Sequence, residues 1–309
     1  MSAVDVGRCL GILGMVGLLW GCGTGADGDT GAATGPTDDP RFDSSTWPDS
    51  ITDGDRVAMV YGPADYDGES LLPVIMLLHG YGASGILQDL VYQLRPRVDT
   101  AGFILILPEG TVDSRGLQFW NATEACCDFD ASGVDDVGHL LTVLDGVEAT
   151  YPVDPDRITV TGHSNGGYMS YRMGCEASDR LAAIAPLAGL AFSNEADCAA
   201  SQAVSVLHTH GTEDEDVPYD GFPPFLPSAQ ESVERWTARA GCSGATESAG
   251  TADYETSVDG EEATKTRWSD GCEEGFNAEL WTLNGVGHLP FFTDLWRDEH
   301  TAWLLAQRR

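Results

Sequence analysis

Positive charge is what this sequence lacks most. Its 309 residues hold 16 lysines and arginines against 49 aspartates and glutamates, and Lys265 is the only lysine. Nucleic-acid binding depends on clustered basic residues that displace counterions, so a net charge of −33 argues against such a partner. The composition favours a solvated exterior in a salty or extracellular setting and a neutral substrate, with cation binding as the alternative.

Long apolar runs are absent beyond the N-terminus. Residues 1–22 carry Arg8, an apolar stretch and then Gly21-Cys22, which together predict an export signal too short to span a bilayer permanently. The end of this segment is similar to a bacterial lipobox, which would place a lipid on Cys22 and the protein at the cell surface; plain secretion to the outside is the alternative.

The next segment has almost nothing apolar. Residues 23–45 are mostly Gly, Thr, Asp, Ala and Pro, so we expect a flexible linker there. A calcium loop built from its aspartates would lack the glutamate that such loops use. One folded domain is therefore expected over residues 46–309, a length that suits a single large core.

The cysteines follow no zinc-binding spacing. After Cys9 and Cys22 an even number remains, which in an exported protein indicates disulfides. The preferred pairs are Cys175 with Cys198 and Cys242 with Cys272, each worth about 3 kcal/mol by loop closure. The adjacent Cys126 and Cys127 either pair with each other or stay reduced.

Short apolar β-prone runs alternate with helical patterns along the chain. The central runs are almost continuously hydrophobic, which is typical of parallel strands covered by helices on both faces. The sequence therefore predicts an α/β fold with a mostly parallel central sheet, and no internal repeat is visible. The expected strands are Val57–Tyr61, Val74–His79, Phe103–Leu107, Ile158–Thr161, Ala182–Ala188, Val204–Thr209 and Leu280–Leu283; the expected helices are Val134–Ala149, Asn165–Cys175, Ser228–Ala240 and Phe292–Gln307.

A candidate nucleophile follows one of these strands. Strand Ile158–Thr161 leads into Gly162-His163-Ser164-Asn165-Gly166-Gly167, where a helical pattern begins at once. This strand, turn and helix context is the one that a nucleophile elbow requires, whereas the bare Gly-x-Ser-x-Gly pattern is weak in a chain with 37 glycines. Ser164 is therefore the candidate nucleophile, and an ordinary glycine turn is the alternative.

A serine nucleophile needs a base, and two histidines lie far enough downstream. His300 falls inside the C-terminal amphipathic pattern, where a packing or surface role is expected. His288 follows the strand Leu280–Leu283 in a glycine-rich loop that could bring an imidazole to the strand ends. His288 is therefore the candidate base.

The acid is expected after the strand between the serine and the base. Strand Val204–Thr209 leads into His210-Gly211-Thr212-Glu213-Asp214-Glu215-Asp216-Val217-Pro218, a loop with four acids. Asp214 is favoured because the turn at Gly211-Thr212 would direct the residue shortly after it toward the site. Asp216 remains the alternative.

Two further groups of residues complete the predicted site. The backbone N–H groups of Tyr81 and Asn165 are the proposed oxyanion donors, and His79 is expected to be structural. His208 and His210 would share one strand face, but no third ligand stands at metalloenzyme spacing, so we expect no metal. Aromatic residues in the strand-end loops predict a cleft for an aromatic or polymeric acyl group, with rim packing as the alternative; they are Phe119, Trp120, Phe222, Phe225, Phe291 and Phe292, with Trp120 and Phe291 as the favoured substrate contacts.

The ordered motifs resemble one group of proteins. The chain is similar to the poly(hydroxyalkanoate) depolymerase and feruloyl or acetylxylan esterase group of the α/β-hydrolase fold. The resemblance implies the triad Ser164, Asp214 and His288, and it implies that Asp135-Asp136 fixes a helix start. Residues Leu289-Pro290-Phe291 after the histidine depart from the group's usual Thr-Trp-Pro. The matching stretches are Leu78–Gly82, Trp120-Asn121, Ala125–Cys127, Val134–Gly138, Gly162–Gly167, His210–Thr212, Val217–Tyr219 and Gly285–His288.

These observations predict a serine carboxylic ester hydrolase that works through an acyl-enzyme and needs no cofactor. The expected partner is an ester on a polymer, feruloylated or acetylated polysaccharide first and an extracellular polyester second. An inactive surface binding protein on the same fold is the alternative from another class, and a peptidase is a further one.

Overall fold

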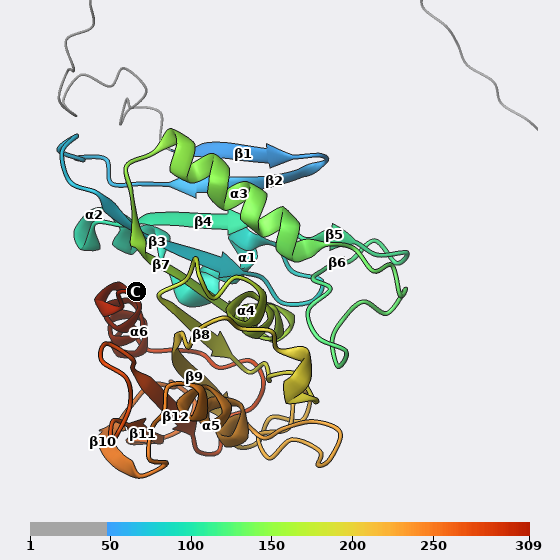
Figure 1. Cartoon of the computed structure of the whole chain (residues 1–309), viewed down its shortest axis with the longest axis vertical. Coiled ribbons are helices and arrows are strands. Elements are labelled where there is room, and N and C mark those ends of the chain that lie inside the picture. The colour runs from blue at the N-terminus through green and yellow to red at the C-terminus, as the bar shows by residue number, and fades with distance from the viewer. Residues whose placement is uncertain (1–47) are drawn as a thin grey trace, which may run out of the picture. The chain divides into compact units, whose positions relative to one another are not determined.

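A single ten-stranded sheet organises the protein. The computed structural model describes residues 48–309. The strand order is β1-β2-β4-β3-β7-β8-β9-β12-β11-β10 (Figure 1). The six central strands, from β4 to β12 in this order, run parallel to one another. They are β4 (Ile104–Pro108), β3 (Leu72–Leu78), β7 (Val153–His163), β8 (Ala183–Leu187), β9 (Ser205–Gly211) and β12 (Ala278–Leu283).

Burial on both faces explains why these strands are apolar along their whole length. Every residue of β3, β4, β8 and β9 is buried. Helices on each face supply the cover, as the near-continuous hydrophobic runs predict. All seven strands expected from the sequence form, with boundaries shifted by a few residues. Strand β7 begins five residues earlier than expected, because its first part is polar and only partly buried and therefore shows no apolar run.

The helices divide between two hydrophobic cores. One core contains residues of α3 (Asp136–Thr150), α4 (Asn165–Glu176) and α5 (Ala229–Arg239) (Figure 1). The other contains residues of α1 (Gly85–Tyr92), α2 (Val98–Ala101) and α6 (Asp294–Ala306). Two short 3-10 turns, η3 (Arg95–Arg97) and η4 (Glu195–Asp197), complete the helical elements. The four helices expected from the sequence form, whereas α1 and α2 are too short to show a helical period.

Antiparallel strands close both sides of the sheet. On one side β1 (Asp49–Asp53) pairs with β2 (Arg56–Tyr61), and on the other β10 (Thr246–Ala252) pairs with β11 (Ala263–Trp268). A register shift interrupts β10 between Ser248 and Gly250, and its residues are mostly exposed. A separate small hairpin joins β5 (Thr111–Val112) to β6 (Gln118–Phe119). Strands β1, β5, β6, β10 and β11 were not predicted from the sequence, because they are short or polar.

Three disulfides join the six cysteines of the described domain. Cys175 at the end of α4 bonds to Cys198, and Cys242 after α5 bonds to Cys272, which are the pairs preferred from the sequence. Cys126 and Cys127 bond to each other, which decides between the two states left open for them.

The N-terminal predictions fall outside the described residues. The signal segment 1–22, the lipid site Cys22 and the linker 23–45 all precede residue 48, where the description begins. Within residues 48–309, no helix combines the length and apolar character needed to cross a bilayer.

Candidate active site

Ser164 occupies the sharp turn between β7 and α4. Its backbone has φ 56° and ψ −119°, a left-handed conformation that is costly for any residue with a side chain. The Ser164 N–H donates to the Leu187 carbonyl at 2.9 Å, which anchors the turn to β8. Ser164 therefore stands at the end of a central strand and the start of a helix, as expected for an elbow.

The glycines around Ser164 are required by close backbone approach. A Cβ on Gly162 would lie 2.6 Å from the Gly166 carbonyl oxygen, and one on Gly166 would lie 2.2 Å from the Leu78 carbonyl oxygen. No flexible side chain could move to relieve either clash. The elbow is thus pressed against the end of β3, where the loop proposed to bind the oxyanion begins.

His288 and Asp214 form a hydrogen-bonded pair. The Nδ1 of His288 donates to Oδ2 of Asp214 at 2.7 Å. The other carboxylate oxygen accepts from the backbone N–H groups of Asp216 and Val217, at 3.0 Å and 2.7 Å. The Asp214 side chain has no exposed surface, whereas Asp216 is exposed, so the geometry joins Asp214 rather than Asp216 to the candidate base.

The charge of Asp214 is stabilised despite its burial. Burial acts to raise the pKa of Asp214, but hydrogen bonds from His210, His288 and the Val217 amide hold it well below its ordinary value. The carboxylate therefore remains ionised at neutral pH and can orient the imidazole of His288 and stabilise its protonated form.

The loops that carry this pair are joined to each other. Glu213 donates its N–H to the Val286 carbonyl at 3.0 Å, and Gly285 donates its N–H to the Thr212 hydroxyl at 2.9 Å. A Cβ on Gly211 would lie 2.2 Å from the Val286 carbonyl oxygen, so only glycine fits there. Because β9 and β12 are parallel neighbours, both loops leave the same edge of the sheet.

His163, the residue before the nucleophile, contacts the candidate base directly. Its Nε2 donates to the backbone carbonyl of His288 at 2.8 Å, and the two rings are 4.7 Å apart between centroids. Burial lowers the pKa of His163 to about 4, so the ring is neutral at physiological pH. This contact brings His288 beside the elbow. No role for His163 was predicted from the sequence, although it lies within the elbow motif.

The loop after β3 lies beside the elbow. A Cβ on Gly80 would lie 3.6 Å from the Ser164 Cβ, so Gly80 and Tyr81 pass next to the candidate nucleophile. Gly80 donates its N–H to Gln88 at 3.0 Å, and Gly82 donates its N–H to the Gln118 carbonyl at 2.8 Å. These bonds on either side of Tyr81 fix the course of the loop.

His79 is structural, as the sequence predicts. Its Nε2 accepts the Gly110 N–H at 2.9 Å and its Nδ1 bonds to the Gly80 carbonyl at 2.8 Å. Burial lowers the pKa of His79 to about 4. The neutral ring thus connects the oxyanion loop to the end of β4.

Trp120 is placed differently from the prediction that it contacts substrate. Its side chain has no exposed surface, and its Nε1 donates to the His79 carbonyl at 2.9 Å. The Trp120 backbone makes two bonds with the Asn165 side chain, at 2.7 Å and 2.9 Å. Trp120 therefore joins the start of α4 to the oxyanion loop from within, and it does not line a cleft. Phe119 and Phe292 are also buried, whereas Phe222, Phe225 and Phe291 are exposed.

A polar cluster on the surface holds Tyr81. The Tyr81 hydroxyl donates to Asp113, which also accepts from the backbone N–H groups of Arg115 and Leu117. The Arg115 guanidinium lies 5.2 Å from the ring centroids of both Tyr81 and Phe129. The Tyr81 hydroxyl holds the pKa of Asp113 down at about 2, so this carboxylate is ionised throughout the neutral range.

Asp135 and Asp136 fix the start of α3, as the resemblance implies. Asp135 is the N-cap and accepts the Gly138 N–H at 2.8 Å. Asp136 is buried, pairs with Arg56 and accepts the Asn121 N–H at 2.7 Å.

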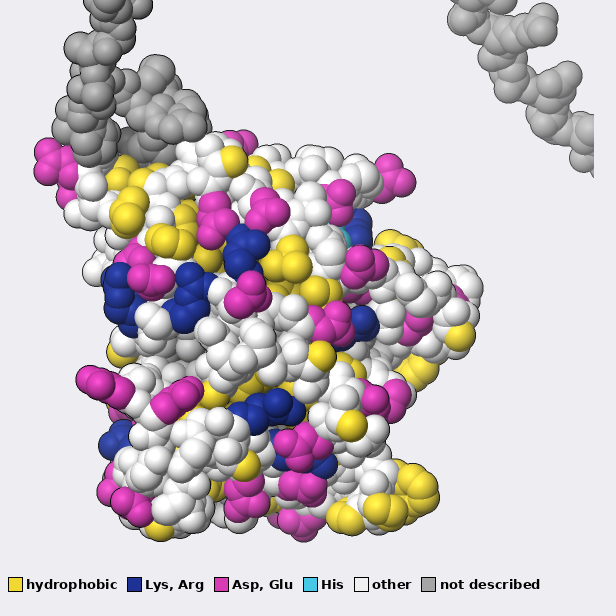
Figure 2. Space-filling view, in the orientation of Figure 1, with side chains coloured by type: hydrophobic (Ala, Val, Ile, Leu, Met, Phe, Trp, Pro, Cys, Tyr) yellow, Lys and Arg dark blue, Asp and Glu magenta, His cyan; other side chains and the backbone are white. Residues whose placement is uncertain are grey.

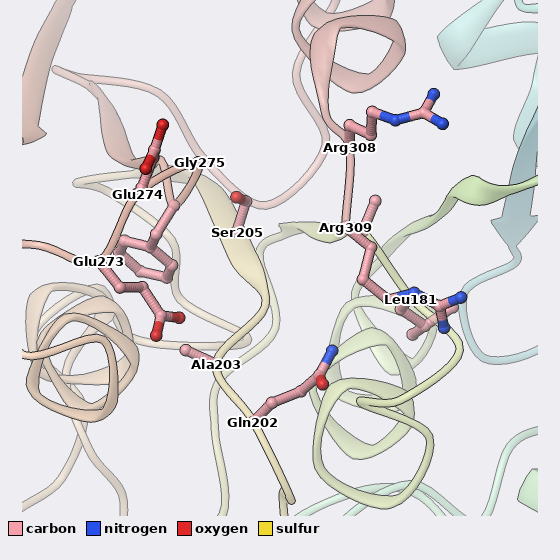
Figure 3. A pocket seen from close by; sticks show the side chains of 11 residues that line it. Leu181, Gln202, Ala203, Ser205, Glu273, Glu274, Gly275, Arg308 and Arg309 are labelled. Carbon is pink, nitrogen blue, oxygen red and sulfur yellow. The ribbon is translucent and has the colours of Figure 1, made fainter.

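A cavity of about 250 Å³ lies at the end of the parallel strands that is opposite to the candidate site (Figure 3). Its lining comes from the segments that precede β8, β9 and β12 and from the C-terminal Arg308 and Arg309. Arg308 pairs with Asp154 and Asp156 at 2.9 Å and 3.0 Å. The cavity therefore lies at the amino ends of the parallel strands, whereas Ser164, Asp214 and His288 follow carboxyl ends.

The chain matches the sequence model of one known protein family. Residues 68–235 match the model of the phospholipase/carboxylesterase family. The chain belongs to this family. The matched part of this phospholipase/carboxylesterase domain contains Ser164 and Asp214, and His288 lies beyond it.

The curated relatives have the names that the resemblance suggested. A bifunctional acetylxylan esterase/xylanase of Neocallimastix patriciarum is 25% identical over 239 residues, which are 76% of this chain and 31% of the relative. Feruloyl esterase B of Piromyces equi is 26% identical over 244 residues, 75% of this chain and 42% of the relative. A poly(3-hydroxybutyrate) depolymerase of Ralstonia pickettii is 29% identical over 160 residues, 47% of this chain and 31% of the relative. The chain thus spans less than half the length of each of these relatives.

The solved structures support the fold. An acetyl xylan esterase from Aspergillus awamori superimposes with a TM-score of 0.60 at 17% identity, covering 83% of this chain and 98% of the other. This family member therefore has the α/β-hydrolase fold, with the mostly parallel sheet predicted from its sequence.

Proposed function

We propose that this family member is a serine carboxylic ester hydrolase with Ser164 as nucleophile, His288 as base and Asp214 as the orienting acid. The observation that carries the proposal is the 2.7 Å bond between His288 and the buried Asp214, on loops adjoining the strained turn of Ser164. The family match supports ester hydrolysis in particular, because it covers the elbow and the acid.

The reaction has two steps. His288 Nε2 takes the proton of the Ser164 hydroxyl as Oγ attacks the ester carbonyl, and the same proton leaves with the alcohol when the carbon–oxygen bond breaks. Water, deprotonated by His288, then attacks the acyl-enzyme and releases the acid and the free serine. The backbone N–H groups of Tyr81 and Asn165 are the proposed donors to the oxyanion that forms in each step.

We propose that the substrate is an ester attached to a polymer, with acetylated or feruloylated polysaccharide as the first candidate. Hydrophobic side chains gather along the right-hand margin of the molecule (Figure 2), on the side where Figure 1 draws β5, β6 and the loop before α5. Exposed large hydrophobic residues in the loops that follow β6, β9 and β12 are Phe129, Phe222, Phe225 and Phe291. An acidic protein that exposes large apolar side chains there is suited to an uncharged, partly apolar substrate.

A polyester depolymerase is the second candidate, favoured by the same exposed residues. Phe222 and Phe225 are 67% and 70% exposed and stack on each other at 6.1 Å between ring centroids. Such a surface would adsorb to a water-insoluble aliphatic polymer.

We also propose that the protein is exported, with residues 1–22 as its signal, 23–45 as a linker and 46–309 as the catalytic domain. The three disulfides support an oxidising compartment. Mass determination of the mature N-terminus from a host that processes lipoproteins tests whether Cys22 is acylated or the chain is freely secreted.

The test is hydrolysis of p-nitrophenyl acetate by the purified domain and by Ser164→Ala. We expect turnover by the wild type and a loss of about 10⁵-fold or more in the variant. An inactive wild type would favour a binding protein on the same fold, and faster cleavage of matched amides than esters would favour a peptidase. Release of acetate, ferulate or hydroxybutyrate from the natural polymers then ranks the two substrate candidates.

The exposed Phe291 offers a sharper test of the polymer proposal. Phe291→Ala should lower kcat/KM by about tenfold on a bulky feruloyl ester and by less on p-nitrophenyl acetate, because only the larger acyl group reaches the rim. Equal effects on both esters would contradict a substrate contact at this position.

A further inference from the structure

Three buried polar side chains form a chain that ends at Asp214. The Tyr171 hydroxyl is 2.7 Å from His208 Nδ1, and His208 Nε2 is 2.9 Å from His210 Nδ1. His210 Nε2 is 2.8 Å from the Val217 carbonyl and 3.3 Å from Asp214 Oδ2. Tyr171, His208 and His210 each have no exposed surface.

The direction of these hydrogen bonds follows from the last acceptor. The Val217 carbonyl can only accept, so His210 carries its proton on Nε2. With the His208 ring neutral and its Nδ1 accepting from the Tyr171 hydroxyl, His208 Nε2 donates to His210 Nδ1. Burial lowers the pKa of His208 well below its ordinary value, in keeping with a neutral ring.

This network leaves no nitrogen of the pair free to bind a metal. The two rings lie on one face of β9 as the sequence predicts, stacked at 5.2 Å, but their facing nitrogens share a proton with each other. The alternation of His208 and His210 therefore serves a hydrogen-bond network and not a metal site.

This series of hydrogen bonds connects the elements that carry the proposed nucleophile and acid. Tyr171 lies on α4, the helix that begins directly after Ser164, and His208 and His210 lie on β9, which leads to Asp214. The His210 N–H reaches the same carboxylate oxygen that accepts from His288, from the side of the protein interior.

We propose that His210 is a positioning residue that holds Asp214 for His288, and that Tyr171 and His208 fix the ring of His210 in turn. This proposal rests on the proposed function, because the role of His210 is to hold Asp214, the acid of the proposed triad. The imidazole of His210 restrains the carboxylate without competing as a second base, since its Nε2 proton is committed to Val217 and Asp214.

Two substitutions of His210 separate positioning from packing. In His210→Gln the side-chain N–H₂ can reach the place of Nε2 and donate to Asp214 and Val217, whereas the shorter amide of His210→Asn reaches only toward His208. We expect kcat for p-nitrophenyl acetate to fall about tenfold or more in His210→Asn with KM within about twofold, and most of kcat to return in His210→Gln.

Controls distinguish this outcome from simple destabilisation. His139→Asn changes another buried histidine, on α3 with Asp53 as its partner, and should lower the melting temperature without the loss of kcat. The far-downfield proton resonance of the His288–Asp214 bond should shift or broaden in His210→Asn and persist in His210→Gln. If His210→Asn does not fold, His210→Gln and Tyr171→Phe carry the test, with a loss of about threefold in kcat expected for the latter.

The outcomes keep the two proposals apart. If Ser164→Ala retains activity, the proposed function fails. If Ser164→Ala is inactive while His210→Asn keeps wild-type kcat and the downfield resonance, the proposed function stands and the positioning role of His210 is overturned. Equal losses in His210→Asn and His210→Gln, with the resonance unchanged, would also overturn it, because the N–H near Asp214 would then be irrelevant.

Discussion

The two halves of the candidate site are held in place by different means. The acid–base half, around Asp214 and His288, is supported from the interior by His163 and His210, both buried. The oxyanion half, around Tyr81, is fastened at its outer end to Asp113, beside the half-exposed Arg115. One half thus depends on buried histidines, and the other on an ion pair between the covered Asp113 side chain and the half-exposed Arg115.

The difference reflects what each half must do. The acid–base half has to keep one carboxylate charged out of water, which takes several donors arranged around it at fixed distances. The oxyanion half is proposed to act through backbone N–H groups, which requires only a loop of fixed course, and the bonds to Asp113 suffice for that. We therefore expect substitutions in the first half to have larger effects on catalysis than substitutions in the second.

The largest effect should come from Asp214→Asn. The amide cannot stabilise the imidazolium of His288 and would favour the wrong tautomer, so we expect kcat on p-nitrophenyl acetate to fall by about 10³–10⁴-fold. Asp216→Asn is the matched control on the same loop; its side chain is exposed, and we expect kcat within about twofold of the wild type. A reversed order of the two variants would assign the acid to Asp216.

A smaller effect is expected in the oxyanion half from Tyr81→Phe. The substitution removes the hydroxyl that donates to Asp113 but keeps the ring and the backbone N–H, so the loop loses one tether and kcat should fall by about tenfold or less. Stopped-flow measurement of acylation would detect it. A loss as large as that of Asp214→Asn would show that the bond between Tyr81 and Asp113 contributes as much to catalysis as the contacts around Asp214.

The smallest effect at neutral pH is expected from the buried histidines, which should change the free energy of unfolding mainly in acid. The pKa values of His79 and His163 are lowered by burial to about 4, from an ordinary value of 6.5. Between these values the unfolded chain binds protons that the folded chain excludes, so the free energy of unfolding should fall as pH drops from 6.5 to 4. The slope is about 1.4 kcal/mol per pH unit for each histidine concerned.

Urea unfolding at fixed, moderately high salt measures this slope while screening the repulsion among the many carboxylates. Burial also lowers the pKa of His300, to about 3, so His300→Asn should reduce the slope by the contribution of one histidine. The pKa of Asp113 is about 2, so the stability that its charge contributes is lost only in stronger acid. A stability that does not change between pH 6.5 and 4 would contradict the neutral state of the buried histidines.

The sequence predicted the parallel core of the fold well, because strands buried on both faces must be apolar along their whole length. It missed β10 because Thr246–Ala252 is mostly exposed and has no apolar alternation, and its pairing with β11 depends on partners distant in the chain. Short strands such as β5 likewise form only in the context of the tertiary structure.

Within the site, local motifs were more informative than single residue types. Ser164 and Asp214 stand where their strand-end loops predicted them, and the bond between Asp214 and His288 joins two of the expected partners. The burial of Trp120 could not be foreseen, since an aromatic residue near a strand end suits either a rim or a core. The hydrogen bonds that join Tyr171, His208 and His210 were also not predicted. Alternating histidines indicate only a shared strand face, and they give no indication that Tyr171, on a helix elsewhere in the sequence, lies beside them.

The outer strand β10 has a consequence for the protein in concentrated solution. Its register shift at Ser248–Gly250, together with mostly exposed residues such as Glu247, leaves a poor template for a strand from a neighbouring molecule. Many copies crowded in one volume should therefore stay separate, and none should lengthen the sheet of another.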